Sequence, residues 1–208
     1  MTSTKTEDDV KFASAQKIKK KDYALLKKQF ITMPLKGKIP VHFGWQKLTK
    51  SVRSGTNYGI VCGKQSGVMV VDVDTHDEGL STWEHIIKNI TIPETIVVKT
   101  GSGGFDYYFA FDEDIKTSAK SILVNKDDID KKIGIDVRAD GGQVVGAGSI
   151  HPNGQQYELI SFVADLPKIP ESLKNLLTKK TFIKMNDSGI VGFHDIVKDL
   201  PSSEKDKK

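Results

Sequence analysis

The stretch VMVVDVD (residues 68–74) decides the centre of the expected fold. Its apolar run is typical of a strand buried on both faces, and Asp72 and Asp74 emerge where that strand ends. Side chains two residues apart in a strand point to the same side, so both carboxylates are expected on one face. Like charges this close repel each other unless a cation lies between them, and a divalent metal ion is one candidate. Taken alone, such a pair is more often a solvated strand end.

A second strand-like stretch, IGIDVR (133–138), adds a third carboxylate and an arginine. Its isoleucines and Val137 share one face, which leaves Asp136 and Arg138 together on the other. Two explanations stay open at this point. The two residues form an ion pair within the sheet, or Asp136 binds metal with the first two acids while Arg138 contacts a phosphate.

The loop TGSGG (100–104) joins two further predicted strands, at 94–98 and 105–111. Its glycines allow backbone N–H groups to converge on an anion, and Thr100 and Ser102 add hydroxyl donors. An ordinary hairpin turn is the simpler explanation of the loop by itself. The presence of all three motifs on short neighbouring strands favours a site for metal ions and a triphosphate.

The remaining sequence predicts an α+β fold, because helix-containing segments precede a run of hairpins. Helices are expected at 13–30, 81–90 and 170–178, and further strands at 57–63, 67–74, 132–138, 143–148 and 156–160. The strands at 57–63 and 67–74 are expected to be joined by a tight turn. The helix at 81–90 should bury Trp83, Ile86, Ile87 and Ile90.

Length and composition fit one buried domain. The chain has 208 residues, and its longest apolar runs are too short to cross a membrane. The single cysteine, Cys62, excludes an internal disulfide and favours a reducing, intracellular compartment. A net charge of +4 is compatible with nucleic-acid binding. Lysines gather between positions 17 and 28, where a solvated helix face is the more common explanation and a phosphate-binding strip the alternative.

From about residue 34 to 178 the chain resembles the prim-pol domain of the archaeo-eukaryotic primase superfamily, a bifunctional DNA primase/polymerase. A collinear series of motifs carries the resemblance. Besides the acids at 72 and 74, the series contains GKIP and GW (37–45), NYGIVCGKQSG (57–67), TGSGG with YYF (100–109), IDVRADGGQVV (135–145), SIHPNGQQY (149–157) and LPKIP (166–170).

The resemblance implies an RRM-like antiparallel sheet core with helices, an N-terminal α/β unit, and an active site in the cleft between them. The catalytic domain would extend over residues 13–180. A flexible N-terminus at 1–12 would precede it, and a C-terminal tail or linker at 181–208 would lead to a missing domain.

The same resemblance implies template-dependent nucleotidyl transfer, that is, primer synthesis and extension in DNA replication. Asp72, Asp74 and Asp136 would hold two Mg²⁺ or Mn²⁺ ions, one activating a 3′-hydroxyl and the other the triphosphate. The residues that would contact nucleotide or template are Thr100, Ser102, Gly103, Gly104, Asp106, Arg138, Asn57, Ser149 and His151. The partners would be a DNA template or primer, an NTP or dNTP, and a replicative helicase domain or protein. A virus, phage or plasmid would encode the chain.

One position departs from the family pattern. Family members carry a histidine shortly after the paired glycines, where this chain has Asp106. Strand alternation places Asp106 with Tyr108, opposite Phe105, Tyr107 and Phe109, so its side chain should point to the site. An anion there would repel a triphosphate by about 1 kcal/mol or more. Alternatively, Asp106 would act as an extra metal ligand.

Two other functions are compatible with parts of this pattern. Asp106 suggests a catalytically impaired domain that only binds nucleotide or single-stranded DNA. The pair Asp72-x-Asp74 also occurs in metal-dependent glycosyltransferases, but that function leaves Asp136, Arg138 and the glycine loop unexplained.

Overall fold

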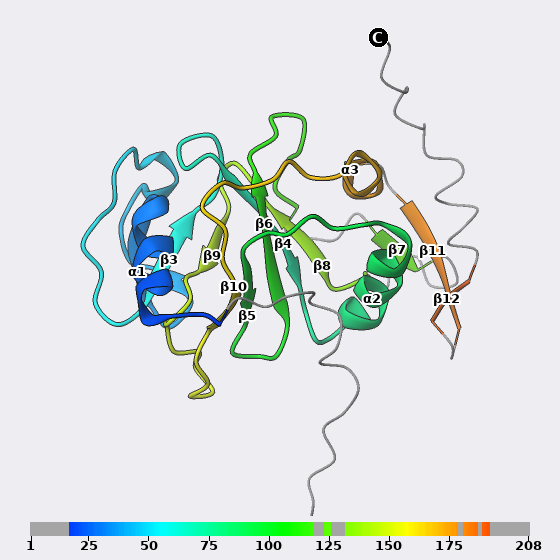
Figure 1. Ribbon diagram of the computed structural model, residues 1–208, viewed down its shortest axis with the longest axis horizontal. Helices are drawn as coiled ribbons and strands as arrows, with labels where there is room; N and C mark the ends of the chain where they lie inside the picture. The colour runs from blue at the N-terminus through cyan, green and yellow to red at the C-terminus, as the bar shows by residue number, and fades with distance from the viewer. Residues whose placement is uncertain (1–16, 119–122, 126–131, 179–180, 187–188, 192–208) are drawn as a thin grey trace, which may run out of the picture.

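The computed structural model describes residues 17–118, 123–125, 132–178, 181–186 and 189–191. The chain has an α+β fold, which confirms the predicted class. Figure 1 shows its parts from left to right: helix α1 with a four-stranded sheet, then a five-stranded sheet, then helices α2 and α3. All strand pairs within these two sheets are antiparallel.

The five-stranded sheet has β4 next to one edge, between β6 and β8. In spatial order its strands are β10 (Glu158–Ser161), β5 (Val97–Lys99), β6 (Phe105–Ala110), β4 (Val68–Val73) and β8 (Ile135–Arg138). Hydrophobic clusters cover both faces of this sheet. Met69, Val71 and Val73 belong to one cluster, and Val68 and Val70 to the other. This placement explains the uninterrupted apolar run of β4.

Helices α2 (Gly79–Asn89) and α3 (Glu171–Thr178) cover one face of the sheet. Trp83 and Ile86 of α2 and Leu173 of α3 are buried in the cluster beneath them. Ile87, which was expected to point inward, is 39% exposed, so that part of the prediction is wrong. Ile87 lies about 100° round the helix from Ile86, at the edge of the face that Trp83, Ile86 and Ile90 bury.

The four-stranded sheet and helix α1 (Lys20–Gln29) cover the other face. The strand order is β2 (Ile39–Pro40), β1 (Thr32–Lys36), β3 (Tyr58–Val61) and β9 (Gln143–Val145). Leu26 and Phe30 anchor the helix in the shared cluster. This layer corresponds to the expected N-terminal α/β unit, but its last strand comes from the second half of the chain.

The predicted tight turn between β3 and β4 is present at residues 64–67, but the two strands that it joins belong to different sheets. The two strands are joined only by a bridge between Gly63 and Val68. Strands β8 and β9 likewise belong to different sheets. Both connections therefore cross between the two layers.

Helix α1 begins at Lys20, whereas the sequence predicted a start at residue 13. The backbone N–H of Lys19 donates to the Asp22 carboxylate at 2.7 Å, which caps the first turn. Residues 17–19 are not helical. Residues 13–16 and the expected N-terminal segment 1–12 lie outside the described residues.

A third sheet contains strands from beyond position 180, where the domain was expected to end. Its strands are β7 (Leu123–Asn125), β11 (Thr181–Asn186) and β12 (Gly189–Val191). Strand β11 runs parallel to β7 and antiparallel to β12. The rest of the expected tail, 192–208, lies outside the described residues. In the part of the chain that the structure describes, every helix is too short or too polar to cross a membrane.

Candidate active site

Three aspartates form a row across the five-stranded sheet. Asp72 on β4 lies directly opposite Asp106 on β6 and Asp136 on β8. Directly opposed residues of antiparallel strands have Cβ atoms about 4.5–5.5 Å apart. Asp74 follows two positions after Asp72 and shares its side of the chain. The three predicted metal ligands are therefore neighbours, and Asp106 lies beside them as a fourth carboxyl group.

The row lies on the face of the sheet that the four-stranded sheet covers. Val70 on β4 and Tyr108 on β6 belong to the cluster between the two sheets, and the acids continue the same face. The side chains of Asp72 and Asp136 are 18% and 17% exposed, so they keep only partial access to solvent. An active site in a cleft between the two layers remains a prediction.

Arg138 binds two acids of the row. Its Nη2 donates to Oδ2 of Asp72 and to Oδ2 of Asp136, each at 3.0 Å, and its Nε donates to the same oxygen of Asp72 at 3.2 Å. Of the two explanations that the sequence left open for Arg138, the structure shows the ion pair. The guanidinium supplies the positive charge that the crowded carboxylates need.

Burial and mutual repulsion disfavour the charged forms of the acids. Burial raises the pKa of Asp74, and the neighbouring Asp72 charge raises it further. Burial also raises the pKa of Asp136, an effect that Arg138 partly offsets. Carboxyl groups with perturbed pKa values of this kind cluster at functional sites.

Asp106 points into the row, as predicted, and is 2% exposed. Burial holds the pKa of Asp106 well above its usual value, and the charge of Asp72 adds to the shift. The two carboxyl groups also share a hydrogen bond. The protonated form, which donates that bond, is thus favoured, and this weakens the expected repulsion between Asp106 and a triphosphate.

The glycine loop is the turn of the β5–β6 hairpin. The N–H groups of Gly103 and Gly104 donate to the carbonyl and the hydroxyl of Thr100, at 2.9 and 3.0 Å. A side chain on Gly104 would meet the Val73 carbonyl oxygen at 2.2 Å, so the loop packs against the end of β4 as only glycine allows. Within the described residues, the amides of Gly101 and Ser102 form no hydrogen bond, so these two N–H groups, rather than those of Gly103 and Gly104, remain for an anion.

A second turn, HPNG (151–154), packs against the glycine loop. Asn153 Nδ2 donates to the Gly101 carbonyl at 2.8 Å. A side chain on Gly101 would meet Cβ of His151 at 2.2 Å, so the two turns are in close contact. His151 thereby lies next to the loop, as its assignment to the nucleotide site requires. Thr100 and Ser102 join their hydroxyl groups at 3.0 Å in the same loop.

Asn57 and Ser149 are already bonded to the backbone. The Asn57 side chain donates to the carbonyls of Ile150 and Gly37 and accepts from the Ile150 amide. Ser149 is 0% exposed, and its hydroxyl accepts a bond from the Tyr58 amide. A contact of either residue with nucleotide would have to replace these bonds, so their assignment stays a prediction.

Two basic residues near the acids were not predicted. His76 Nε2 lies 3.7 Å from Asp74 Oδ2, but β4 ends at Val73, so strand alternation does not extend to position 76. Lys38 lies in the turn between β1 and β2. Its positive charge partly offsets the rise in the pKa of the Asp74 carboxyl. No local pattern connects positions 38 and 74, so only the fold reveals this proximity.

Comparison with known families agrees with these motifs. The family model described as bifunctional DNA primase/polymerase, N-terminal, matches residues 22–172, which include every acid and loop named above. The chain belongs to this Prim-Pol family. Family membership indicates a primase or polymerase type of nucleotidyltransferase that binds DNA and nucleotides. No curated protein matches the chain. A helicase partner and a virus, phage or plasmid origin stay predictions.

Prim-Pol enzymes generally use divalent metal ions, and the donor chemistry here fits them. Asp72, Asp74 and Asp136 offer hard oxygen ligands on one face. Among the described residues, however, no three acidic, histidine or cysteine side chains are arranged to hold one ion. In this arrangement Arg138 occupies Oδ2 of both Asp72 and Asp136.

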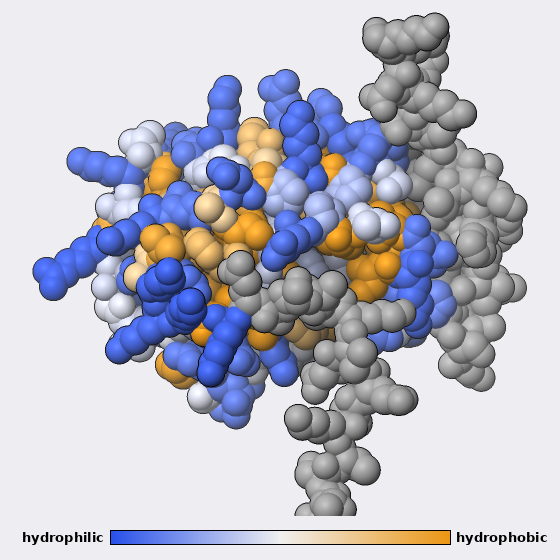
Figure 2. All heavy atoms as spheres, viewed as in Figure 1, coloured by the Kyte–Doolittle hydropathy of each residue, from blue (hydrophilic) through white to orange (hydrophobic). Residues whose placement is uncertain are grey.

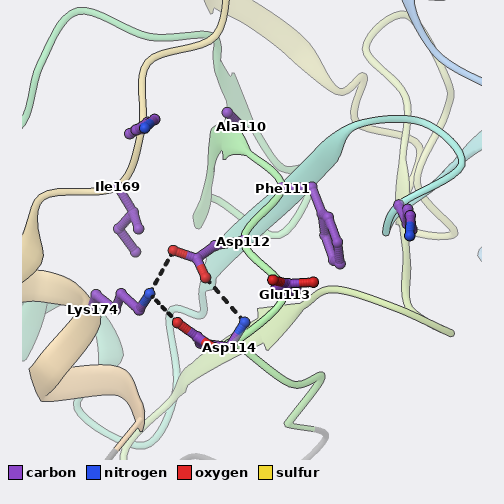
Figure 3. Close-up of a pocket in the computed structure, with 9 residues that line it drawn as sticks. Ala110, Phe111, Asp112, Glu113, Asp114, Ile169 and Lys174 are labelled. Atoms are coloured by element: carbon purple, nitrogen blue, oxygen red, sulfur yellow. Dashed lines mark hydrogen bonds and ion pairs between the residues drawn. The ribbon is translucent and has the colours of Figure 1, made fainter.

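A hollow of about 460 Å³ lies at the opposite end of β6, beyond Ala110 (Figure 3). Lys174 of α3 binds Asp112 and Asp114 there, at 2.7 and 2.8 Å. The hydrogen bond from Lys174 lowers the pKa of Asp112. The two ion pairs tie α3 to the segment that follows β6, so we assign the hollow a structural role. The row of opposed acids and the adjoining glycine loop make the aspartate row the better candidate.

Proposed function

We propose that this chain catalyses template-dependent nucleotidyl transfer, the synthesis or extension of a primer on DNA. The observation that carries the proposal is the row of Asp106, Asp72 and Asp136, with Asp74 and the glycine loop at the same end of β4. Family membership supplies the type of reaction. The glycosyltransferase alternative receives no support from the family match.

Asp72, Asp74 and Asp136 would hold two divalent cations, Mg²⁺ or Mn²⁺. Bound there, such ions activate an attacking 3′-hydroxyl and neutralise the charge of the leaving pyrophosphate. Metal ions would compete with Arg138 for the oxygens of Asp72 and Asp136. A guanidinium released from these acids is suited to bidentate contact with a phosphate of the incoming triphosphate.

The glycine loop would position the triphosphate. The free amides of Gly101 and Ser102 and the Ser102 hydroxyl are donors of the kind that bind phosphate oxygens. The clasp between Asn153 and Gly101 supports this role, because a loop held in place loses little entropy when it binds its ligand. Most of the catalytic effect would come from such positioning and charge neutralisation.

Asp106 supports a second candidate, a Prim-Pol domain that binds nucleotide or single-stranded DNA without efficient chemistry. The residue is buried beside Asp72, and it offers a carboxyl group where family members carry a histidine. In this case, Asp106 would hold Asp72 by their shared hydrogen bond and keep it from a metal ion.

Nucleotide incorporation on a primed DNA template with Mn²⁺ tests the proposal. Asp72→Ala should reduce incorporation at least about a thousandfold, because bound metal is worth several kcal/mol to the transition state. Asp165→Ala, which removes an exposed carboxylate outside the site, should leave the rate unchanged. Full activity of Asp72→Ala, with an unchanged unfolding temperature, would refute the two-metal assignment.

The variant Asp106→His separates the two candidates. If the native chain extends the primer as well as the variant does, Asp106 is a working substitute and the enzyme proposal stands. If only the histidine variant extends it, the native chain is a binding module. Both proteins are compared with dNTPs and with NTPs.

A further inference from the structure

We propose that the exposed surface of residues 36–53 binds single-stranded DNA and leads it to the aspartate row. The surface consists of Lys36, Lys38, Ile39, Val41, Phe43, Lys47, Lys50 and Arg53, all exposed. The inference rests on the proposed function, which gives a reason for a DNA strand at this side of the molecule. The experiments below can refute the DNA-binding surface without refuting the proposed function, and the reverse.

The apolar part of this surface has no partner within the described chain. Phe43 is 100% exposed, Ile39 71% and Val41 57%. Single exposed apolar residues are common on protein surfaces and need no explanation. Three of them at alternating positions of one short segment are unusual, and exposed apolar groups that gather in one place mark interaction sites.

The charge of the surrounding chain identifies the kind of partner. Residues 23–71 contain eight lysines and arginines and no aspartate or glutamate, whereas the whole chain has 27 acidic residues. None of the five cations of the 36–53 surface forms an ion pair with a described residue. Figure 2 shows hydrophilic side chains that project from the side of α1 and β3, with hydrophobic atoms between them. Such a surface complements a polyanion.

The combination of lysines with an exposed phenylalanine favours a single strand over a duplex. The bases of a single strand are free to stack on an aromatic ring, and a basic surface follows its phosphates. In a duplex the bases stack on each other, which would leave Phe43 without a role. We therefore assign the surface to single-stranded DNA, the form that a template takes next to the growing end of a primer.

The loop that carries Phe43 has a rigid base. Val41 N–H donates to the Pro34 carbonyl at 3.2 Å, and Val52 N–H donates to the Thr32 carbonyl at 2.8 Å. Both ends of the loop are thus fixed to neighbouring positions of β1. The loop projects its side chains from a fixed origin, and this reduces the entropy lost on binding.

Contacts connect this surface to the candidate active site. The Gly37 carbonyl accepts from Asn57, which also holds Ile150, and Pro152 lies beside Gly37. Pro152 belongs to the HPNG turn that clasps the glycine loop. Lys38, in the same β1–β2 turn, is the cation near Asp74. A strand bound along residues 36–53 would therefore arrive at the acids and the glycine loop.

Fluorescence anisotropy of a labelled oligo(dT) strand of about 20 nucleotides measures the binding directly. Phe43→Ala should weaken binding about fivefold or more, the usual effect of losing one stacked base. The double variant Lys47→Ala/Lys50→Ala should reduce the slope of log Kd against log salt by about 1.4, or about 0.7 for each phosphate contact on a single strand. The matched controls are Ile87→Ala and Lys88→Ala on α2, on the opposite layer of the fold.

Tryptophan fluorescence provides a second readout. The chain has two tryptophans, of which Trp83 is 2% exposed in the α2 cluster. Trp45 lies in the same loop as Phe43, so DNA bound at the surface should quench its emission. Trp45→Phe should abolish the quenching, while a comparable binding constant from anisotropy shows that the strand still binds.

Different results separate this inference from the proposed function. If Phe43→Ala and the lysine variant bind oligo(dT) like the native chain while Asp72→Ala loses incorporation, the inference is wrong and the proposed function stands. If those variants lose DNA binding but the native chain incorporates no nucleotide, the DNA-binding surface is supported and the proposed function is wrong. Binding of phosphatidylserine vesicles through Phe43, without binding of DNA, would overturn the assignment of the partner.

Discussion

Two nitrogens of the Arg138 guanidinium donate to one carboxylate oxygen of Asp72, at 3.0 and 3.2 Å. Under the proposed function, a metal ion bound by Asp72 would compete for this oxygen. Arg138 and a divalent cation are therefore expected to exclude each other at this position. Their competition can be measured without any catalytic turnover.

Replacement of Arg138 by methionine should destabilise the metal-free protein and strengthen its response to metal. Without the guanidinium, the half-buried acids lose their cation, at a cost of about 1–3 kcal/mol for a pair that is partly open to solvent. Mn²⁺ should then raise the unfolding temperature of Arg138→Met more than that of the native chain, because binding no longer displaces a competitor.

Thermal unfolding in EDTA and in Mn²⁺ measures both effects. Arg53→Met, which removes an exposed arginine from the 36–53 surface, serves as the control and should respond to Mn²⁺ like the native chain. An equal Mn²⁺ shift in all three proteins would show that Arg138 and the metal do not share a site.

Gly104→Ala should loosen the glycine loop. The new methyl group would lie 2.2 Å from the Val73 carbonyl oxygen, so the loop must move away from β4. We expect a loss of about 1–3 kcal/mol in stability and a weaker affinity for nucleotide. Gly55→Ala is the matched control, because a side chain there would meet nothing within 4 Å. Urea unfolding and nucleotide titration of the two variants provide the comparison, and equal behaviour would refute the close packing.

Lys174→Met should lower stability at neutral pH by about 1 kcal/mol or less, the usual value for a partly exposed network. The bond from Lys174 lowers the pKa of Asp112 in the folded state. A lowered carboxyl pKa stabilises the fold above the ordinary carboxyl pKa of 3.8, and the contribution is lost as the pH falls through the folded-state value. The difference between native and variant should therefore shrink below about pH 4.

Urea unfolding at pH 7 and at acid pH tests this dependence. Lys64→Met is the control, since Lys64 lines the same hollow without an ion pair to any described residue. A difference between native and Lys174→Met that stays constant with pH would show that packing, and not charge, ties α3 to β6.

Strand alternation alone was enough to predict which side chains share a face. It placed Asp136 with Arg138, and Asp106 with Tyr108, as the structure does. Alternation carries no information on which strands pair. The pairing of β3 with β1 and β9, rather than with β4, depends on contacts between residues far apart in the chain. The sequence therefore predicted the turn between β3 and β4, but not that the chain changes sheets there.

The sequence likewise predicted only part of the candidate site. The acids and the glycine loop have local signatures, so the sequence named them. The hydrogen bonds that occupy Asn57 and Ser149 come from distant backbone groups, and the nearness of Lys38 to Asp74 comes from the packing of two layers. The sequence showed an acidic residue at position 106. It did not show that this residue is buried, and burial favours its protonated form.

Because β4 lies between two hydrophobic clusters, its backbone should be among the last parts of the fold to open to solvent. Local fluctuations that expose backbone amides to deuterium exchange start at edges and loops and reach central, doubly covered strands last. The amides of Val71 and Val73 flank Asp72 in such a strand and should exchange only on global unfolding. The spacing of the carboxylates therefore persists for as long as the molecule is folded.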